Sequence, residues 1–273
     1  MTRRRIVLAR LLACIVLPIA AGSLAAYGAS AQPATPGSKK APLVAAASDL
    51  QFALDEIVAR LNRDTGITPR ITYGSSGNFA RQIEQGAPFE LFLSADEAYV
   101  DRLTARGLTQ GKGALYGIGR IVLFTPHGSP LEPDPGLRNL AARLASGDSG
   151  RLAIANPEHA PYGRAAEQAL RSLGIWEAVQ AKLLLGENVA QAAQFASSGN
   201  ADGGIIAYSL ALAPALRERG TFALLPDTLH APLRQRMVLL QRASPAAASF
   251  CDYLRSPASR AILSEYGFLL PEN

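Results

Sequence analysis

The stretch Gly74-Ser75-Ser76-Gly77-Asn78-Phe79-Ala80-Arg81-Gln82-Ile83 decides the interpretation of this fold. It follows a strand-like run, residues 70–73, and leads into a segment with helical spacing. Two glycines allow a sharp turn, and two serine hydroxyls lie beside the free N–H groups of a helix start. Those N–H groups and the helix dipole favour an anion. The alternative is an ordinary strand–loop–helix turn with a serine N-cap.

A similar junction lies upstream. Residues 43–47 form a short apolar run that predicts a buried parallel strand. Ser48 is the predicted N-cap of the helix that follows, Asp49 lies in its first turn, and Gly66 ends it. Ser48 and Ser76 therefore stand at the carboxyl ends of neighbouring parallel strands, where open α/β sheets bind ligands.

The remaining pattern alternates strand-like and helix-like runs, which predicts an α/β fold with a parallel-rich sheet in each of two lobes. A Pro/Gly-rich run, residues 126–136, predicts the crossover into the second lobe, and the chain returns after Pro232. The predicted lobes are residues 43–121 with 233–273, and residues 122–232, joined by two hinge crossovers. The expected strands are 91–94, 120–125, 152–155, 204–207 and 236–240, and the expected helices are 97–106, 137–146, 163–173, 189–198, 245–254 and 257–266.

The first 31 of the 273 residues have the pattern of a secretory signal peptide: four arginines, an apolar run and Ala29-Ser30-Ala31 as the cleavage motif. We expect cleavage after Ala31, a periplasmic protein, and a disordered lead-in over residues 32–42. A membrane anchor is the alternative, but the apolar run is short. We treat the similarity of residues 11–14 to a lipoprotein cleavage box as a chance match. Export by the twin-arginine route remains an alternative to the Sec route.

Charge and cysteine content narrow the function classes. Without the signal's four arginines, 23 basic residues face 22 acidic ones, a net charge of +1. No nucleic-acid or polybasic membrane surface follows from this balance. Only Cys251 survives processing, so no intrachain disulfide is expected.

Catalytic motifs are missing from the sequence. Asn78 occupies the second glycine position of a nucleophile elbow, and the three histidines have neither triad nor ligand spacing. Glu158-His159 is more typical of a loop than of an acid–base or metal site. Phosphate-loop and dinucleotide fingerprints are also absent, so we expect a non-enzyme without a cofactor.

Two further helix starts belong to the second lobe: Ala160-Pro161-Tyr162-Gly163 and Glu187-Asn188-Val189. Four helix starts directed into one cleft could bind a tetrahedral dianion with neutral donors only.

Several motifs resemble, in order, those of the periplasmic molybdate-binding proteins of ABC importers. The resemblance runs from about Leu43 to Leu270. Its motifs are residues 45–48, 74–77, 80–88, 93–96, 156–163 and 266–268.

The resemblance implies a type II periplasmic binding fold that closes on one molybdate or tungstate ion, with no direct metal ligands. It assigns the hydroxyl and N–H groups of Ser48 and Ser76 to the first lobe's ligands. Backbone N–H groups of Tyr162 and Val189 are the second lobe's, and some members also use the residue that is Asp49 here.

One branch of that family places a tyrosine hydroxyl on the ion, where this chain has Ala207. Tyr208 follows, and side-chain alternation along a strand directs it away from the site into core packing. The carboxylate of Asp49 would repel a dianion unless it is turned to solvent or paired, so only its backbone is a candidate ligand.

The expected function is that of a monomeric solute-binding protein that delivers molybdate or tungstate to an ABC permease. One alternative keeps the fold and changes the ion to sulfate or phosphate. A second is a secreted serine hydrolase that uses Ser76, and a third is an exported chaperone or sensor that has lost transport.

Overall fold

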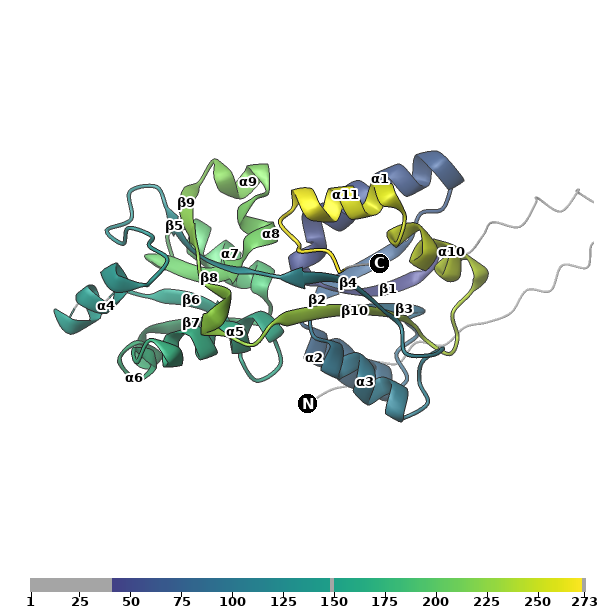
Figure 1. Ribbon diagram of the computed structural model, residues 1–273, viewed down its shortest axis with the longest axis horizontal. Coiled ribbons are helices and arrows are strands. Elements are labelled where there is room, and N and C mark those ends of the chain that lie inside the picture. The colour runs from purple at the N-terminus through teal and green to yellow at the C-terminus, as the bar shows by residue number, and fades with distance from the viewer. Residues whose placement is uncertain (1–40, 148–149, 272–273) are drawn as a thin grey trace, which may run out of the picture. The chain divides into compact units, whose positions relative to one another are not determined.

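The computed structural model describes residues 41–147 and 150–271. The signal peptide and most of the lead-in predicted from the sequence lie outside these residues. Two five-stranded sheets form the described part, with strand orders β2-β1-β3-β10-β4 and β7-β6-β8-β5-β9 (Figure 1). The strands are β1 Leu43–Ala47, β2 Arg70–Gly74, β3 Leu91–Ser94, β4 Ala114–Gly119, β5 Ile121–Pro126, β6 Leu152–Ala155, β7 Leu183–Gly186, β8 Gly203–Ala207, β9 Gly220–Leu224 and β10 Leu233–Leu239.

Helices follow most strands. In the first lobe they are η1 Ser48–Leu50, α1 Gln51–Thr65, α2 Ser76–Glu84, α3 Glu97–Ala105, α10 Pro245–Leu254 and α11 Pro257–Glu265. In the second lobe they are α4 Arg138–Ala145, α5 Pro161–Ser172, α6 Trp176–Val179, η2 Gln180–Lys182, α7 Val189–Ser197, α8 Tyr208–Ala211, α9 Pro214–Arg217 and η3 Asp227–Leu229. In the described part of the chain, no helix is both long and apolar enough to cross a bilayer.

Both sheets are mixed. β1 pairs in parallel with β2 and β3, and β6 with β7 and β8, as the βα pattern predicted. The strands next to the lobe connections, β10 with β4 in one sheet and β5 with β9 in the other, pair antiparallel. The two-lobed α/β fold with two crossovers is therefore confirmed, while parallel pairing extends over only half of each sheet.

The first crossover lies earlier than the sequence predicted. β4 belongs to the first sheet and β5 to the second, with Arg120 alone between them. The Pro/Gly-rich run 126–136 therefore lies inside the second lobe. β4 escaped prediction because Gly117 and Gly119 interrupt its apolar pattern. The return crossover spans residues 225–232, between β9 and β10.

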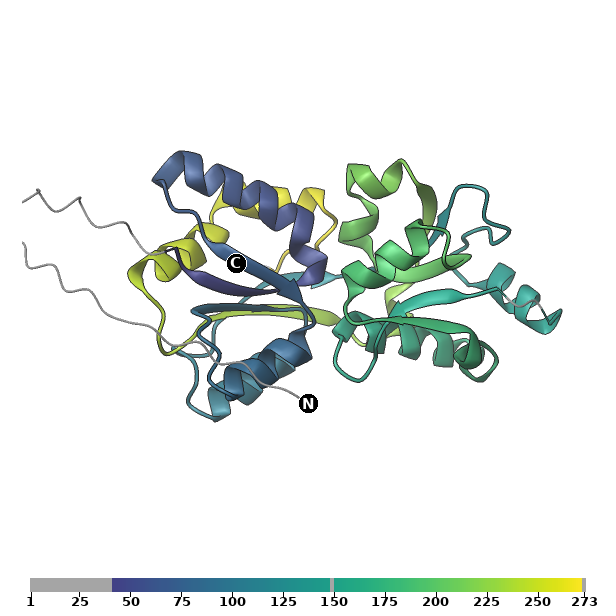
Figure 2. The ribbon, with the colours of Figure 1, turned by 180° about the vertical axis from the view of Figure 1, so that it is seen from behind.

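The alternation of side chains along β1 explains the layers of the first lobe. Val44 and Ala46 belong to a core cluster with residues of α1, α10 and α11, and Ala45 belongs to a separate cluster with residues of α2 and α3. Figure 1 shows the same separation, with α1 and α11 on one side of the sheet and α2 and α3 on the other. The carboxyl ends of β1, β2 and β3 therefore lead into helices on both faces (Figure 2).

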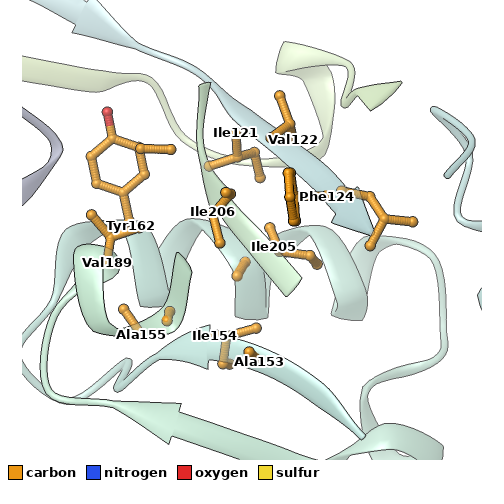
Figure 3. Packing of buried hydrophobic residues seen from close by; sticks show 14 of the residues in the cluster. Ile121, Val122, Phe124, Ala153, Ile154, Ala155, Tyr162, Val189, Ile205 and Ile206 are labelled. Atoms are coloured by element: carbon orange, nitrogen blue, oxygen red, sulfur yellow. The ribbon is translucent and has the colours of Figure 1, made fainter. Parts of the chain in front are cut away.

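One apolar cluster fills the second lobe and extends to Ala47, Ala95 and Leu233 of the first. It joins Ile121, Val122 and Phe124 of β5 to the strands β6 and β8 and to the helices α5 and α7 (Figure 3). Tyr162 and Val189, the first apolar side chains of α5 and α7 past Pro161 and Asn188, belong to this cluster. Their burial fixes the starts of both helices relative to the sheet.

Candidate oxyanion site

The five residues predicted as ligands all line one small cavity of about 10 Å³, and they are Ser48, Asp49, Ser76, Tyr162 and Val189. Each occupies the first or second position of a helix: η1 for Ser48 and Asp49, α2 for Ser76, α5 for Tyr162 and α7 for Val189. The first N–H groups of a helix have no acceptor inside it. The cavity is therefore surrounded by helix starts from both lobes.

The remaining lining residues are small or neutral: Ala47, Gly74, Ser75, Ala95, Ala160 and Pro161. The lining contains no lysine or arginine, so a bound anion would be held by neutral donors. The described residues also contain no group of three His, Cys, Asp or Glu side chains that could hold a metal ion.

Ser76 has its hydroxyl oriented by a neighbour. Its Oγ accepts a hydrogen bond from the Ala95 N–H at 2.9 Å, which leaves the hydroxyl proton to be donated elsewhere. Ser76 is completely buried and is the first residue of α2. The adjacent Ser75 occupies the N-cap position, yet its side chain makes no cap bond. The simple serine-cap alternative therefore does not describe this turn.

Ser48 is not an N-cap either, which corrects the sequence prediction. It is the first residue of the 3₁₀ turn η1, and Ala47 stands at the cap position. The Ser48 Oγ accepts from the Ala190 N–H of α7 across the cleft, at 3.3 Å. The tight turn before α1 moves Ser48 inside the helical segment.

In each of the two second-lobe helices that start at the cavity, one N–H group is the first donor available to a ligand. Pro161 has no N–H, so the N–H of Tyr162 is the first one of α5. In α7 the Asn188 side chain accepts from the N–H groups of Ala190 and Gln191, at 3.0 and 3.1 Å. That cap leaves the N–H of Val189 as the first donor of this helix.

The Asp49 carboxylate is paired rather than turned to solvent. It is 1% exposed, and its Oδ2 accepts from Tyr162 Oη at 2.9 Å and from Gln235 Nε2 at 2.7 Å. Burial raises the pKa of Asp49 from 3.8 to about 6, against the opposite effect of these hydrogen bonds. Burial and the nearby carboxylate raise the pKa of Tyr162 well above its usual value, so its hydroxyl remains a donor.

The lobes also touch around the cavity. The Gly77 N–H donates to the His159 carbonyl at 3.0 Å, and the Ser75 hydroxyl lies 2.9 Å from His159 Nδ1. Arg164 of α5 forms an ion pair with Asp96 of the first lobe. The sequence pattern predicted only a loop position for His159 and no role for Gln235. Both act through contacts between segments that are far apart in the chain.

Tyr208 is outside the cavity lining, as predicted, but it lies past the end of β8, so alternation along a strand is not the reason. It begins α8 and is half-buried, and its ring packs edge-on against Phe222, 5.7 Å between centroids. Ala207, the last residue of β8, is also outside the lining.

Comparisons with known proteins agree with this geometry. The profile of the bacterial extracellular solute-binding proteins matches residues 42–269. The chain belongs to this family. The solute-binding protein is 34% identical to the molybdate-binding protein ModA of Rhodobacter capsulatus over 86% of this chain and 91% of that relative. It is 35% identical to ModA of Azotobacter vinelandii, over 82% of this chain and 88% of the relative.

A solved structure extends the similarity to the fold. The periplasmic molybdate-binding protein of Azotobacter vinelandii superimposes with a TM-score of 0.76 and 29% identity, covering 85% of this chain and all of that one. The resemblance predicted from the motifs is thus confirmed. The relatives are solute-binding proteins, so the family is not one of enzymes. The serine hydrolase alternative is wrong.

Proposed function

We propose that this solute-binding protein captures molybdate or tungstate in the periplasm and delivers it to the permease of an ABC importer. The ligands are the hydroxyl and N–H groups of Ser48 and Ser76 and the backbone N–H groups of Asp49, Tyr162 and Val189. The observation that supports this proposal most strongly is that these five helix-start positions line one cavity whose lining contains no basic side chain. The protein acts as a monomer after removal of residues 1–31.

Neutral donors suit a dianion that loses its water. Each oxygen then needs short, charge-assisted hydrogen bonds, and N–H groups fixed at helix starts supply them together with the helix dipoles. Rigid donors also select by size. Sulfate is smaller, and it would leave some donors with long or missing bonds, which costs binding free energy. Molybdate and tungstate are nearly equal in size, and the same donors accept both.

Closure couples the two lobes to the ion. Ser48, Asp49 and Ser76 belong to the first lobe, and Tyr162 and Val189 to the second. An ion that contacts both groups binds best when the lobes meet, so it shifts the population toward the closed form. The permease would then receive a closed, loaded protein.

Ser76→Ala should weaken molybdate binding by about 10- to 100-fold, because a hydrogen bond to a charged group contributes about 1.5–3 kcal/mol. The buried Ala95 N–H loses its acceptor, but one such loss costs about 1–3 kcal/mol, less than the stability of a typical domain, so the fold should remain intact. Isothermal titration calorimetry measures the affinity. Ser249→Ala is the matched control, because Ser249 is exposed on α10 and bonds only the Pro245 carbonyl. Equal affinities for the Ser76 variant and the wild type would contradict the assigned site.

Arg164→Met should weaken molybdate binding by up to about fivefold. The ion pair with Asp96 and the 2.7 Å hydrogen bond to Tyr99 join the lobes, but both partners are partly exposed, and such pairs contribute only about 0.2–1 kcal/mol. Arg171→Met is the control, since Arg171 pairs with Glu167 in its own helix. If both variants weaken binding equally, the Arg164 pair has no part in closure.

One observation favours a second candidate, hydrogen phosphate. Asp49 lines the cavity, and within the described residues its Oδ1 has no hydrogen-bond partner. A protonated oxyanion could donate to such an oxygen, whereas molybdate and sulfate at neutral pH carry no proton to donate. A competition titration decides between them. Displacement of bound molybdate by equimolar phosphate would favour this candidate, and failure to displace it at a hundredfold excess would exclude it.

A further inference from the structure

A buried hydrogen-bond network lies directly behind the cavity. Gln235 of β10 is completely buried, and its Nε2 donates to Asp49 Oδ2 at 2.7 Å and to Tyr162 Oη at 3.0 Å. Its Oε1 accepts from Tyr116 Oη of β4 at 2.6 Å. Tyr162 Oη in turn donates to Asp49 Oδ2 at 2.9 Å. Four segments from both lobes therefore meet at one amide group.

The direction of the bonds makes a glutamine necessary at this position. Both amide hydrogens are donated toward the carboxylate and the phenol, and the amide oxygen receives the second phenol. The opposite orientation would place the amide oxygen against the Asp49 carboxylate. Leucine has a similar volume and offers none of these bonds, so it would leave buried polar groups without partners.

Two residues of the network, Tyr116 and Gln235, lie on the strands that adjoin the crossovers, β4 and β10. β4 ends at Gly119, one residue before the crossover at Arg120, and Gly119 pairs with Leu233 of β10. A Cβ on Gly119 would lie 2.3 Å from Tyr162 Oη and 2.6 Å from Gln235 Nε2. The close approach of the strand backbone to the network therefore requires a glycine. The register of β10 against β4 also shifts between Gln235 and Arg236.

The network joins two residues that line the cavity, one from each lobe. Asp49 comes from the first lobe and Tyr162 from the second, and each contributes a proposed N–H ligand from its backbone. Their side chains are bonded to each other and to the same glutamine. These side-chain hydrogen bonds therefore constrain the distance between the backbone N–H groups of Asp49 and Tyr162.

We propose that Gln235, together with the Tyr162 hydroxyl, is a positioning unit that fixes the distance between the Asp49 and Tyr162 N–H groups and so sets which size of oxyanion binds. This inference rests on the proposed function, because it concerns the same ion site. Neither side chain touches the ion. They act through the backbone of the residues that do.

Positioning and simple latching have different consequences for selectivity. A latch only stabilises the closed form, and its loss lowers the affinity for every ion by the same factor. A positioning unit sets the cavity's dimensions, and its loss changes the ratio of the affinities for large and small ions. The ratio of molybdate to sulfate affinity therefore separates the two roles.

The test measures molybdate affinity and its displacement by sulfate for the wild type, Gln235→Leu, Tyr162→Phe and the double variant. We expect the molybdate-to-sulfate affinity ratio to fall at least tenfold in each single variant. The double variant should lose no more than the stronger single one, because both act through one network. Tyr253→Phe is the control: it also removes a tyrosine hydroxyl bonded to a carboxylate, that of Asp64, but within the first lobe.

Each other outcome overturns the inference. If both affinities fall by the same factor, the network is only a latch, and if neither changes, it has no part in binding. Thermal melts of the ion-free variants identify any that is unfolded, and Tyr162→Phe, which removes one oxygen, is the variant that decides in that case. A wild type that binds neither ion overturns the proposed function and this inference together, whereas a binding wild type with an unchanged ratio in the variants overturns this inference alone.

Discussion

Gly77→Ala is expected to weaken molybdate binding at least a hundredfold while the ion-free protein stays folded. Gly77 is the second residue of α2, and its N–H bonds the His159 carbonyl of the opposite lobe. A Cβ there would lie 2.6 Å from that carbonyl oxygen and 3.0 Å from the His159 Cα. Backbone atoms cannot rotate away as a side chain does, so the lobes could not meet as they do here.

The substitution should cost the first lobe little, since alanine suits a helix better than glycine does. Within the first lobe the Cβ would also lie 2.7 Å from Tyr99 Oη, but that is the end of a side chain that can rotate away. The main effect therefore falls on closure, and a hundredfold loss corresponds to about 2.7 kcal/mol. Calorimetry with molybdate measures the affinity. Gly136→Ala is the matched control, because its Cβ would meet nothing closer than 3.5 Å. A Gly77→Ala protein that binds within threefold of the wild type would show that this contact is not part of the bound state.

Asp49→Asn is expected to change how the stability of the ion-free protein depends on pH. Burial raises the pKa of the Asp49 carboxyl from 3.8 in the unfolded chain to about 6 in the folded one. The folded state therefore holds a proton more tightly. The resulting stabilisation is complete below pH 3.8 and is lost as the pH rises through about 6. Its full size is about 3 kcal/mol.

Asparagine has no such titration, and its amide oxygen can still accept from Tyr162 and Gln235. Relative to the wild type, the variant should therefore gain about 2 kcal/mol of unfolding free energy between pH 4.5 and pH 7.5. Urea unfolding at both pH values gives this double difference, in which the other titrating groups cancel. A difference near zero would mean that the carboxyl titrates alike in the folded and unfolded chain.

The sequence predicted which residues line the candidate site, because its signals are local. Strand-to-helix junctions at Ser48 and Ser76 follow from apolar runs that end in serine, and the structure brings both to one cavity with Tyr162 and Val189. The N-cap role of Ser48 was wrong, because the sequence pattern does not distinguish a 3₁₀ turn from the first turn of an α-helix.

Other features depend on tertiary contacts. Gln235 lies between Arg234 and Arg236 in β10, so its sequence neighbours give no sign of burial. Only the folded chain shows that Asp49, Tyr116 and Tyr162 surround it. Short elements were also missed. α8 and α9 contain four residues each, too few for a helical period to be recognised.

The lobe boundaries at residues 121 and 232 stay predictions, although the sheet changes at Arg120 and between β9 and β10.

The most direct test of the central claim, that this cleft selects a large tetrahedral oxyanion, is a thermal melt of the ion-free protein with molybdate, tungstate, sulfate or phosphate in parallel. An ion that binds only the folded state raises the midpoint according to RT ln(1 + [L]/Kd). We expect molybdate and tungstate at a hundredfold excess over Kd to raise it by about 5–10 °C, and sulfate and phosphate at the same concentration to leave it unchanged. A rise with sulfate or phosphate alone, or no rise with any of the four ions, would contradict the account.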